Sequence, residues 1–243
     1  LIAYQTAYLK AHYPDCFMAA LMTSDLNDID RLSIEIAEAE RLGLTVLPPD
    51  VNESFADFAV FREKNAIRFG IAAIKNVGLL VAKQIVKERK NGGRYQNLND
   101  FLVRNAAVLN KKVLENLIRA GALDSFEERA RLNAGVELIT RFAASTSGNR
   151  DASQLSIFDG RTAEIILPAL HLPQVAEDKS LYLSWEKELL GLYLSDHPLK
   201  QYSTMLRDSD ATPIGELAAV QAGQAVRVGG IVQGHIRGVG PQP

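Results

Sequence analysis

The sequence has 243 residues, of which 47% are hydrophobic and 23% are charged. This composition is average for a globular protein and excludes a wholly disordered chain, while the length favours two domains, or one domain and a tail. The single cysteine, Cys16, excludes an intrachain disulfide and a thiolate metal site, which favours a reducing compartment. Because we find neither an apolar stretch of about 18 residues nor the pattern of a signal peptide, we expect a soluble, cytoplasmic protein.

The charge is distributed unevenly, although the net charge is only −2. From Arg62 to Arg119 there are thirteen Lys and Arg against four Asp and Glu, whereas the rest of the chain has fourteen against twenty-five. An excess of this size in one segment is typical of a phosphate-binding module, and by itself it fits DNA, RNA or an acidic protein partner equally well.

The first third of the chain alternates helix and short strand. Residues 1–22 predict two helices separated by Pro14, with no recognisable start, so we expect the chain to be a piece of a longer protein. Residues 28–42 have the apolar spacing of a helix, and Gly43 is a suitable stop. A short strand follows at TVLPP, and AVFREKNAIRFG predicts a two-stranded hairpin that turns at Glu63 to Asn65.

The rest of the chain is expected to be helical, then irregular, then extended. Residues 70–144 predict helices, residues 145–178 a linker rich in small polar residues and proline, and residues 181–194 one more helix. The sequence QAVRVGGIVQGHIRG near the end predicts two strands, which are too few to close a sheet. The expected fold class is therefore mainly α and multidomain.

A helical hairpin in IKNVGLLVAKQIVKERK is the sharpest functional signal. Asn76 and Gly78 predict a tight turn before an amphipathic helix that starts at Leu79. Such a turn leaves the first N–H groups of the second helix unpaired beside the positive end of its dipole, which suits a phosphate. Gly78 would allow close approach of that phosphate. The predicted DNA contacts in this first set are Lys75, Asn76, Val77, Gly78 and Lys83.

A second hairpin is predicted in NKKVLENLIRAGALDSF, with a further helix capped near Asp124 or Ser125. Two such units in tandem could contact both backbones of a duplex. The alternative is a plain helical hairpin with a solvated basic face. The predicted contacts in this second set are Asn110, Lys111, Lys112, Arg119 and Gly121.

The segment QLSIF places apolar side chains inside the predicted linker. Gln154, Leu155, Ile157 and Phe158 have no core of their own there, so we expect them to dock on a partner as a short extended peptide. The alternative is a linker that folds back on its own domain.

No group of residues predicts catalysis or metal binding in this chain. The four histidines have no Cys or carboxylate at ligand spacing, and GGIVQGHIRGVG does not have the strand, turn and helix order of a dinucleotide site. Asp25, Asp28 and Asp30 precede a helix, where aspartate is favoured as a cap.

Five segments together resemble the bacterial family C replicative polymerases, the α subunits of DNA polymerase III. They are YQTAYLKAHYPDCFMAALMTSD, LGLTVLPPDVNES, IRFGIAAIKNVG, NKKVLENLIRAGALDSF and EKELLGLYLSDHPL. The resemblance implies a replicative DNA-directed DNA polymerase that binds duplex DNA, the sliding clamp and other replicase subunits. It departs from the family at Ala72, where glycine is frequent, and after about Arg237.

The resemblance also implies a domain order and further site residues. Residues 1–65 would end the fingers domain, 66–144 would form a tandem helix-hairpin-helix domain, 145–178 a linker with the clamp-binding motif, 179–215 a helical connector and 216–243 an incomplete OB-fold. Gln5, Tyr8 and Lys10 would lie near the template or the incoming nucleotide.

The catalytic palm with its metal-binding aspartates is absent from these residues. The two Mg²⁺ ions of the full polymerase would therefore be bound elsewhere, and this chain alone should be inactive. Two other interpretations stay open: a helix-hairpin-helix protein of repair or recombination without a polymerase, and a scaffold that docks on the clamp or on other subunits.

Overall fold

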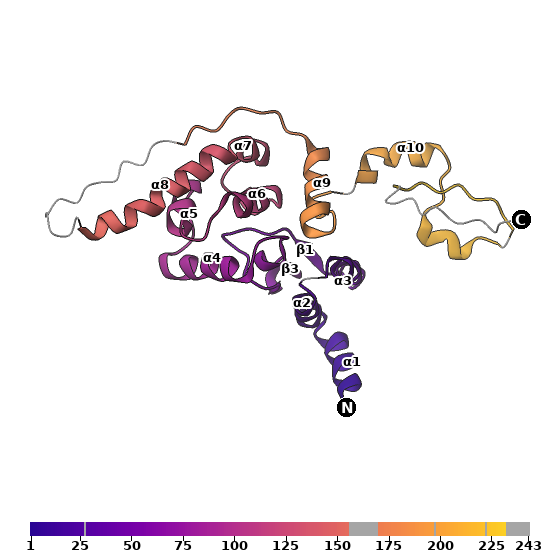
Figure 1. Cartoon of the computed structure of the whole chain (residues 1–243). Helices are drawn as coiled ribbons and strands as arrows, with labels where there is room; N and C mark the ends of the chain where they lie inside the picture. The colour runs from indigo at the N-terminus through magenta and orange to yellow at the C-terminus, as the bar shows by residue number, and fades with distance from the viewer. Residues whose placement is uncertain (27, 156–169, 197, 222, 232–243) are drawn as a thin grey trace, which may run out of the picture. The chain divides into compact units, whose positions relative to one another are not determined.

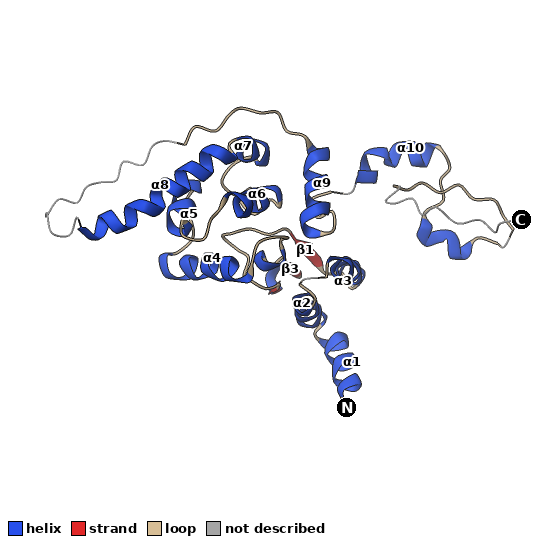
Figure 2. Cartoon of the chain, viewed as in Figure 1, coloured by secondary structure: helices blue, strands red, loops and turns tan. Residues whose placement is uncertain are grey.

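The computed structural model describes residues 1–26, 28–155, 170–196, 198–221 and 223–231, and it is mainly helical, as predicted (Figures 1 and 2). The chain forms two compact units, residues 1–195 and 196–243. Within the first unit, one continuous apolar core runs from helix α2 to helix α9. The predicted DNA-binding segment lies entirely in this first unit.

Three helices open the chain, namely α1 (Ile2–His12), α2 (Pro14–Ser24) and α3 (Ile29–Arg41). Pro14 is the first residue of α2, which confirms the predicted break, because proline at this position costs the helix no hydrogen bond. Asp28 caps α3 by accepting a hydrogen bond from the Arg31 backbone N–H at 3.1 Å, as expected for an aspartate that precedes a helix.

A three-stranded sheet follows, with the order β1-β3-β2. Its strands are β1 (Thr45–Leu47), β2 (Ala59–Phe61) and β3 (Ala66–Arg68). The predicted hairpin is confirmed, since β2 pairs antiparallel with β3, while β1 pairs parallel with the other edge of β3. The expected boundary between residues 65 and 66 is wrong as a domain boundary, because it separates β3 from both of its partner strands.

The basic segment folds into a succession of short helices. They are α4 (Leu79–Gly92), α5 (Leu98–Asn105), α6 (Lys111–Arg119), α7 (Arg129–Ala134) and α8 (Val136–Leu155). The helix expected to start near Asp124 or Ser125 starts at Arg129 instead. The residues before it form turns, and the Asp124 carboxylate pairs with the Arg129 guanidinium at 2.6 Å instead of capping a helix.

Helix α8 continues further than the sequence predicted. It ends at Leu155, so the first eleven residues of the expected linker at 145–178 are helical. The polar residues at its start do not break it, because the Ser145 and Thr146 hydroxyls donate to carbonyls of the preceding turn. The next proline along the chain is Pro168, so the backbone ladder can continue through the serines and Gly148.

Helix α9 (Lys179–Leu190) belongs to the first unit and packs on α6. It ends at Leu190, because Gly191, with a φ of +84°, terminates the helix earlier than the predicted Leu194. The predicted connector at 179–215 is therefore divided between the two units, because the second unit begins at residue 196.

The second unit contains η4 (Pro198–Tyr202), α10 (Ser203–Asp208) and η5 (Ile214–Ala219). Its residues 223–231 are irregular, so the strand expected there is wrong for these residues. The Arg227 carbonyl accepts a backbone hydrogen bond from the Thr212 N–H at 2.7 Å. A strand is stabilised by a ladder of such bonds to a partner strand, and a single bond does not form a ladder. The remainder of the expected OB-fold, residues 232–243, lies outside the described residues.

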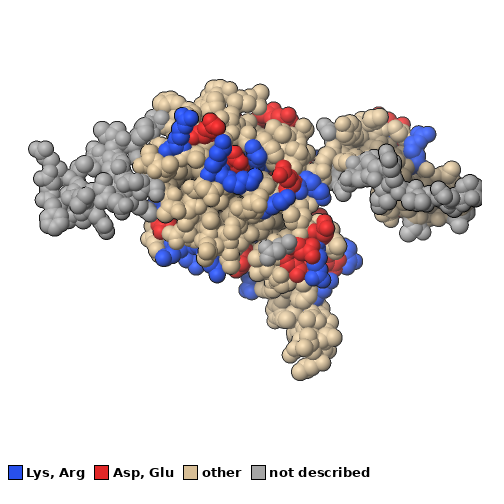
Figure 3. Space-filling model, in the orientation of Figure 1, with Lys and Arg blue, Asp and Glu red and all other residues tan. Residues whose placement is uncertain are grey.

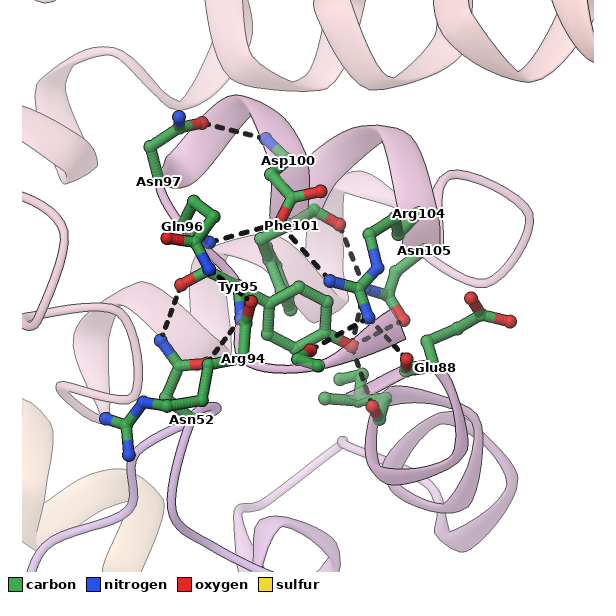
Figure 4. A network of polar contacts seen from close by, with 12 residues as sticks. Asn52, Glu88, Arg94, Tyr95, Gln96, Asn97, Asp100, Phe101, Arg104 and Asn105 are labelled. Carbon is green, nitrogen blue, oxygen red and sulfur yellow. Dashed lines mark hydrogen bonds and ion pairs between the residues drawn. The ribbon is translucent and has the colours of Figure 1, made fainter. Parts of the chain in front are cut away.

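A buried polar network joins the loop after β1 to α4 and α5 (Figure 4). The Asn52 side chain accepts a hydrogen bond from the Tyr95 N–H at 2.8 Å and donates to the Tyr95 carbonyl at 2.9 Å. The Tyr95 hydroxyl donates to the Ile85 carbonyl at 2.7 Å and accepts from the Asn105 amide at 3.0 Å. Arg104 lies over the Tyr95 ring at 4.4 Å. The network fixes α4 relative to the residues that follow β1.

A buried carboxyl in α3 makes the stability of the first unit depend on pH. Burial, together with the hydrogen bond and the negative charge of Asp25, raises the pKa of Glu35 from 4.5 to about 7. Because the pKa is higher in the folded state, the protonated carboxyl stabilises the fold fully below about pH 4.5, and this contribution is lost as the pH rises through 7.

We therefore expect Glu35→Gln to remove part of the fall in the free energy of unfolding between pH 5 and pH 8. The amide stays neutral at every pH in this range and can still bond to Asp25. Urea unfolding at both pH values measures the difference, with Glu40→Gln, at an exposed position of the same helix, as the control. An equal fall in the wild type and in Glu35→Gln would contradict the assignment.

Candidate nucleic-acid interface

The turn between η2 (Ile71–Ala73) and α4 presents three exposed residues, Lys75, Asn76 and Gly78. Val77 is only 2% exposed, so its side chain anchors the turn in the core, and its N–H donates to the Ile74 carbonyl at 2.9 Å. Asn76 has a φ of +62°, which makes it the residue that reverses the chain. Of the five residues in the first predicted set, Val77 could thus contribute only through its backbone.

Two helices distant in sequence hold this turn. The Asn116 side chain on α6 donates to the Lys75 carbonyl at 2.9 Å, and the Lys75 N–H donates to the Leu189 carbonyl on α9 at 3.0 Å. Neither contact follows from a local pattern in the sequence. The one signal for the first is Asn116 itself, a polar residue in the middle of the apolar face of a strongly amphipathic helix.

The N-terminus of α4 has no side-chain cap. Gly78 occupies the N-cap position, whereas Asn97 and Asn110 cap α5 and α6 through their side chains. The first-turn amides of α4 therefore have no oxygen of a capping side chain against them, and they lie at the positive end of the helix dipole. Lys83 is exposed on the following turn. This arrangement can bind a phosphate through backbone N–H groups and nearby ammonium groups.

Backbone strain does not require a glycine at position 78. Its φ is −67°, which any residue adopts, and a Cβ added there meets no atom of the protein within 4 Å. A side chain at this position would therefore extend only into the space where a ligand would approach the amides.

The second predicted set is less accessible. Asn110 accepts a hydrogen bond from the Val113 N–H at 2.9 Å, so it occupies a first-turn amide of α6. Lys111 pairs with Glu137 at 3.2 Å, while Lys112 is exposed and makes no ion pair within the described residues.

Arg119 is partly buried and Gly121 is fully buried in the first unit. The Arg119 Nε donates to Asn133 at 2.9 Å, and its guanidinium lies 5.5 Å from the centre of the Trp185 ring. Gly121 is buried with a φ of +81°, and a Cβ added there would clash with the Arg129 guanidinium. The structure thus leaves Lys112 as the cation of this set that is exposed and makes no ion pair within the described residues.

The turn between α6 and α7 has a different character from the first turn. It contains Asp124, Glu127 and Glu128, and Tyr182 of α9 accepts a hydrogen bond from the Ala130 N–H at 2.8 Å. Acidic and basic side chains alternate over α6 and α7, whereas Lys and Arg predominate along the α4 edge (Figure 3). Carboxylates repel phosphate, so this turn is poorly suited to binding a DNA backbone.

A buried ion pair explains why Arg129 takes no part in the surface. Its guanidinium is 6% exposed and pairs with Glu186 of α9 at 3.1 Å, and the Glu186 carboxylate is 1% exposed. The other oxygen of Glu186 accepts hydrogen bonds from the Leu194 and Ser195 N–H groups, both at 3.0 Å. Helix α9 is therefore fixed to the second hairpin as well as to the first turn.

The remaining predicted residues lie elsewhere. Gln5 and Tyr8 are exposed on α1, and Lys10 pairs with Glu38 of α3 at 2.7 Å. Gln154 and Leu155 end α8, while Ile157 and Phe158 lie outside the described residues.

Among the described residues, His, Cys, Asp and Glu side chains form no group of three that could hold a metal ion. None of their helices is both long enough and apolar enough to cross a membrane.

A family model described as a helix-hairpin-helix motif matches residues 43–132, which contain the sheet, the first turn and helices α4 to α6. The match includes both predicted sets of DNA-binding residues. The chain therefore carries a helix-hairpin-helix motif.

Whole-chain relatives then identify the family. The chain is 44% identical to DNA polymerase III subunit alpha of Thermus aquaticus over 90% of its own length and 17% of that protein. It is 39% identical to the Deinococcus radiodurans protein of the same name, over 100% of the chain and 18% of the relative. The chain belongs to the DNA polymerase III α-subunit family, and it spans about a fifth of the length of the curated relatives it matches.

The open space at Gly78 allows a substitution that separates folding from binding. An aspartate there would cap α4 with its own carboxylate, so we expect Gly78→Asp to leave the free energy of unfolding unchanged or raise it by about 0.5 kcal/mol. The same carboxylate would occupy the amides and repel phosphate, so affinity for duplex DNA should fall by about tenfold or more.

The two measurements are a urea unfolding curve and a titration of labelled duplex. Gly215→Asp is the matched control, since it adds the same charge at another glycine whose Cβ would meet open space, in the second unit. Unchanged duplex affinity in a folded Gly78→Asp variant would show that phosphate does not approach the start of α4.

Proposed function

We propose that this chain is the part of a replicative DNA-directed DNA polymerase that holds duplex DNA by its phosphates. The observation that carries the proposal is the uncapped N-terminus of α4, with Lys75 and Lys83 exposed beside it, inside a helix-hairpin-helix segment. Backbone amides and lysines recognise phosphate and cannot distinguish one base from another. Binding is therefore independent of sequence, as a polymerase that moves along its template requires.

The catalytic step belongs, in this proposal, to parts of the whole protein outside this chain. The whole protein would extend a primer by attack of a 3′ hydroxyl on a deoxynucleotide, and two Mg²⁺ ions would stabilise the attacking and leaving oxygens. Gln5, Tyr8 and Lys10 would lie near the template or the nucleotide. Other replicase subunits would bind the same assembly in the cytoplasm. The similarity to polymerase subunits along nearly the whole chain favours this role over a repair factor or a pure docking scaffold.

The salt dependence of duplex binding tests the phosphate contacts. If about four to six phosphates are neutralised, the logarithm of the association constant should fall with the logarithm of salt concentration at a slope of about −4 to −5. Lys83→Gln should make this slope shallower by about 0.9, while Lys200→Gln in the second unit should not change it. An affinity independent of salt, or a strong preference for one duplex sequence, would overturn the proposal.

We also propose that Gln154, Leu155, Ile157 and Phe158 dock on a ring-shaped sliding clamp. Support comes from the sequence, which places three apolar residues in polar surroundings, and burial of apolar area at about 25 cal/mol per Å² favours a pocket on a partner. Ordering the peptide costs about 1 kcal/mol or more per residue, so the affinity should be micromolar. Attachment to DNA that the clamp encircles raises the effective concentration, which makes such an affinity sufficient.

A synthetic peptide covering residues 152–160 should bind a bacterial sliding clamp with micromolar affinity in a fluorescence anisotropy titration. Changing Leu155 and Phe158 to alanine removes most of the apolar area and should abolish that binding. Should the native peptide bind no better than the double variant, the clamp role fails. The duplex proposal would be unaffected, because it depends on α4.

A further inference from the structure

A hollow of about 400 Å³ lies between α4 and the loop that precedes β2. Its lining combines one aromatic ring with three ammonium groups. The lining residues used here are Phe55, Asp57, Lys83, Lys87 and Lys90, and we call this hollow the Phe55 groove.

The three lysines form a row on one face of α4. Positions 83, 87 and 90 are spaced by four and three residues, so their side chains lie above one another over about 10 Å of helix. All three are exposed, and none makes an ion pair with another described residue. Asp57 is the acidic residue of the lining and is itself exposed. Three lysines against one aspartate therefore give the groove a net positive charge.

Phe55 is held at the edge of this row. Its carbonyl accepts a hydrogen bond from the Ile71 N–H at 2.9 Å, and the Ala56 carbonyl accepts from the Ala72 N–H at 3.0 Å. Phe55 nevertheless remains 42% exposed. The Arg89 guanidinium lies 5.6 Å and the Lys90 ammonium 5.7 Å from the ring centre. An exposed aromatic ring beside cations is a surface on which a base can stack while the cations contact its phosphates.

We infer that the Phe55 groove binds an unpaired segment of a nucleic-acid strand. An unpaired base stacks on the exposed part of the Phe55 ring, while Lys87 and Lys90 contact the phosphates on either side. A hydrogen-bonded base pair within a duplex cannot offer its face in this way, so the ligand differs from the duplex proposed for the start of α4. Sequence preference should be weak, because every base has a face that can stack.

The test uses the whole chain and a labelled twelve-residue oligothymidylate, with a labelled duplex of equal length measured in parallel. Phe55→Leu keeps an apolar side chain but removes the flat ring, so affinity for the oligothymidylate should fall about tenfold, with duplex affinity within twofold of the wild type. Tyr202→Leu removes another exposed ring, in the second unit, and should change neither affinity.

A charge variant provides an independent measurement. Lys87→Gln alters an exposed side chain and should not disturb folding, which urea unfolding checks for every variant. It should lower oligothymidylate affinity severalfold and make the salt slope shallower by about 0.7, the value for a single-stranded phosphate.

Gly78→Asp distinguishes this site from the duplex site. It should weaken duplex binding while oligothymidylate affinity stays within twofold, which is the reverse of Phe55→Leu. If Phe55→Leu binds the oligothymidylate as tightly as the wild type does, or if polyglutamate of equal charge displaces the oligothymidylate equally well, the groove is only a cationic surface and the inference is overturned. If Gly78→Asp weakens both ligands equally, a single shared site replaces the two.

Discussion

The reciprocal hydrogen bonds between Asn52 and the backbone of Tyr95 hold together the parts on which both proposed surfaces depend. Both groups are buried, so breaking either bond would leave a polar atom without water or a partner. They attach the loop after β1 to the turn between α4 and α5. Arg89 adds a second attachment by donating to the Val51 carbonyl at 2.7 Å. The loop that carries Phe55 and the helix that carries the lysine row therefore form one rigid body.

The first turn is fixed in a comparable way, by residues that come much later in the chain. Helix α9 accepts a hydrogen bond from Lys75 through the Leu189 carbonyl and, one turn earlier, forms a buried ion pair with Arg129 through Glu186. One helix thus contacts both hairpins. Truncation before α9 would remove the backbone partner of Lys75. It would also remove Glu186, so that the buried Arg129 guanidinium would keep only the partly exposed Asp124 as an ion-pair partner.

Charge distribution distinguishes the surfaces of the two hairpins. The basic excess of the segment from Arg62 to Arg119 is concentrated, at the surface, on α4 and the turn before it (Figure 3). Around α6 and α7, carboxylates from other helices pair with Lys111 and Arg129. The two predicted hairpins therefore differ: the turn before α4 is suited to anions, and the turn between α6 and α7 is suited to internal packing.

The sequence by itself determined the mainly helical class, the hairpin of β2 and β3, the start of α2 at Pro14 and the position of the first turn. These features depend on local signals: proline geometry, apolar spacing and the turn preferences of Asn76 and Gly78. The resemblance to the polymerase family was also visible in the sequence, because it depends on residue identity along most of the chain.

Only the tertiary structure decided which of the predicted basic residues are exposed and how the segments join. Arg119 and Lys112 carry the same charge and lie in one short segment, but Arg119 stacks near Trp185, which is more than sixty residues away in the sequence. The domain boundary at residue 65 failed for the same reason, since β1 reaches across it to pair with β3. Local sequence specifies helix, strand and turn, whereas burial and ion pairing depend on contacts between distant segments, which no local pattern encodes.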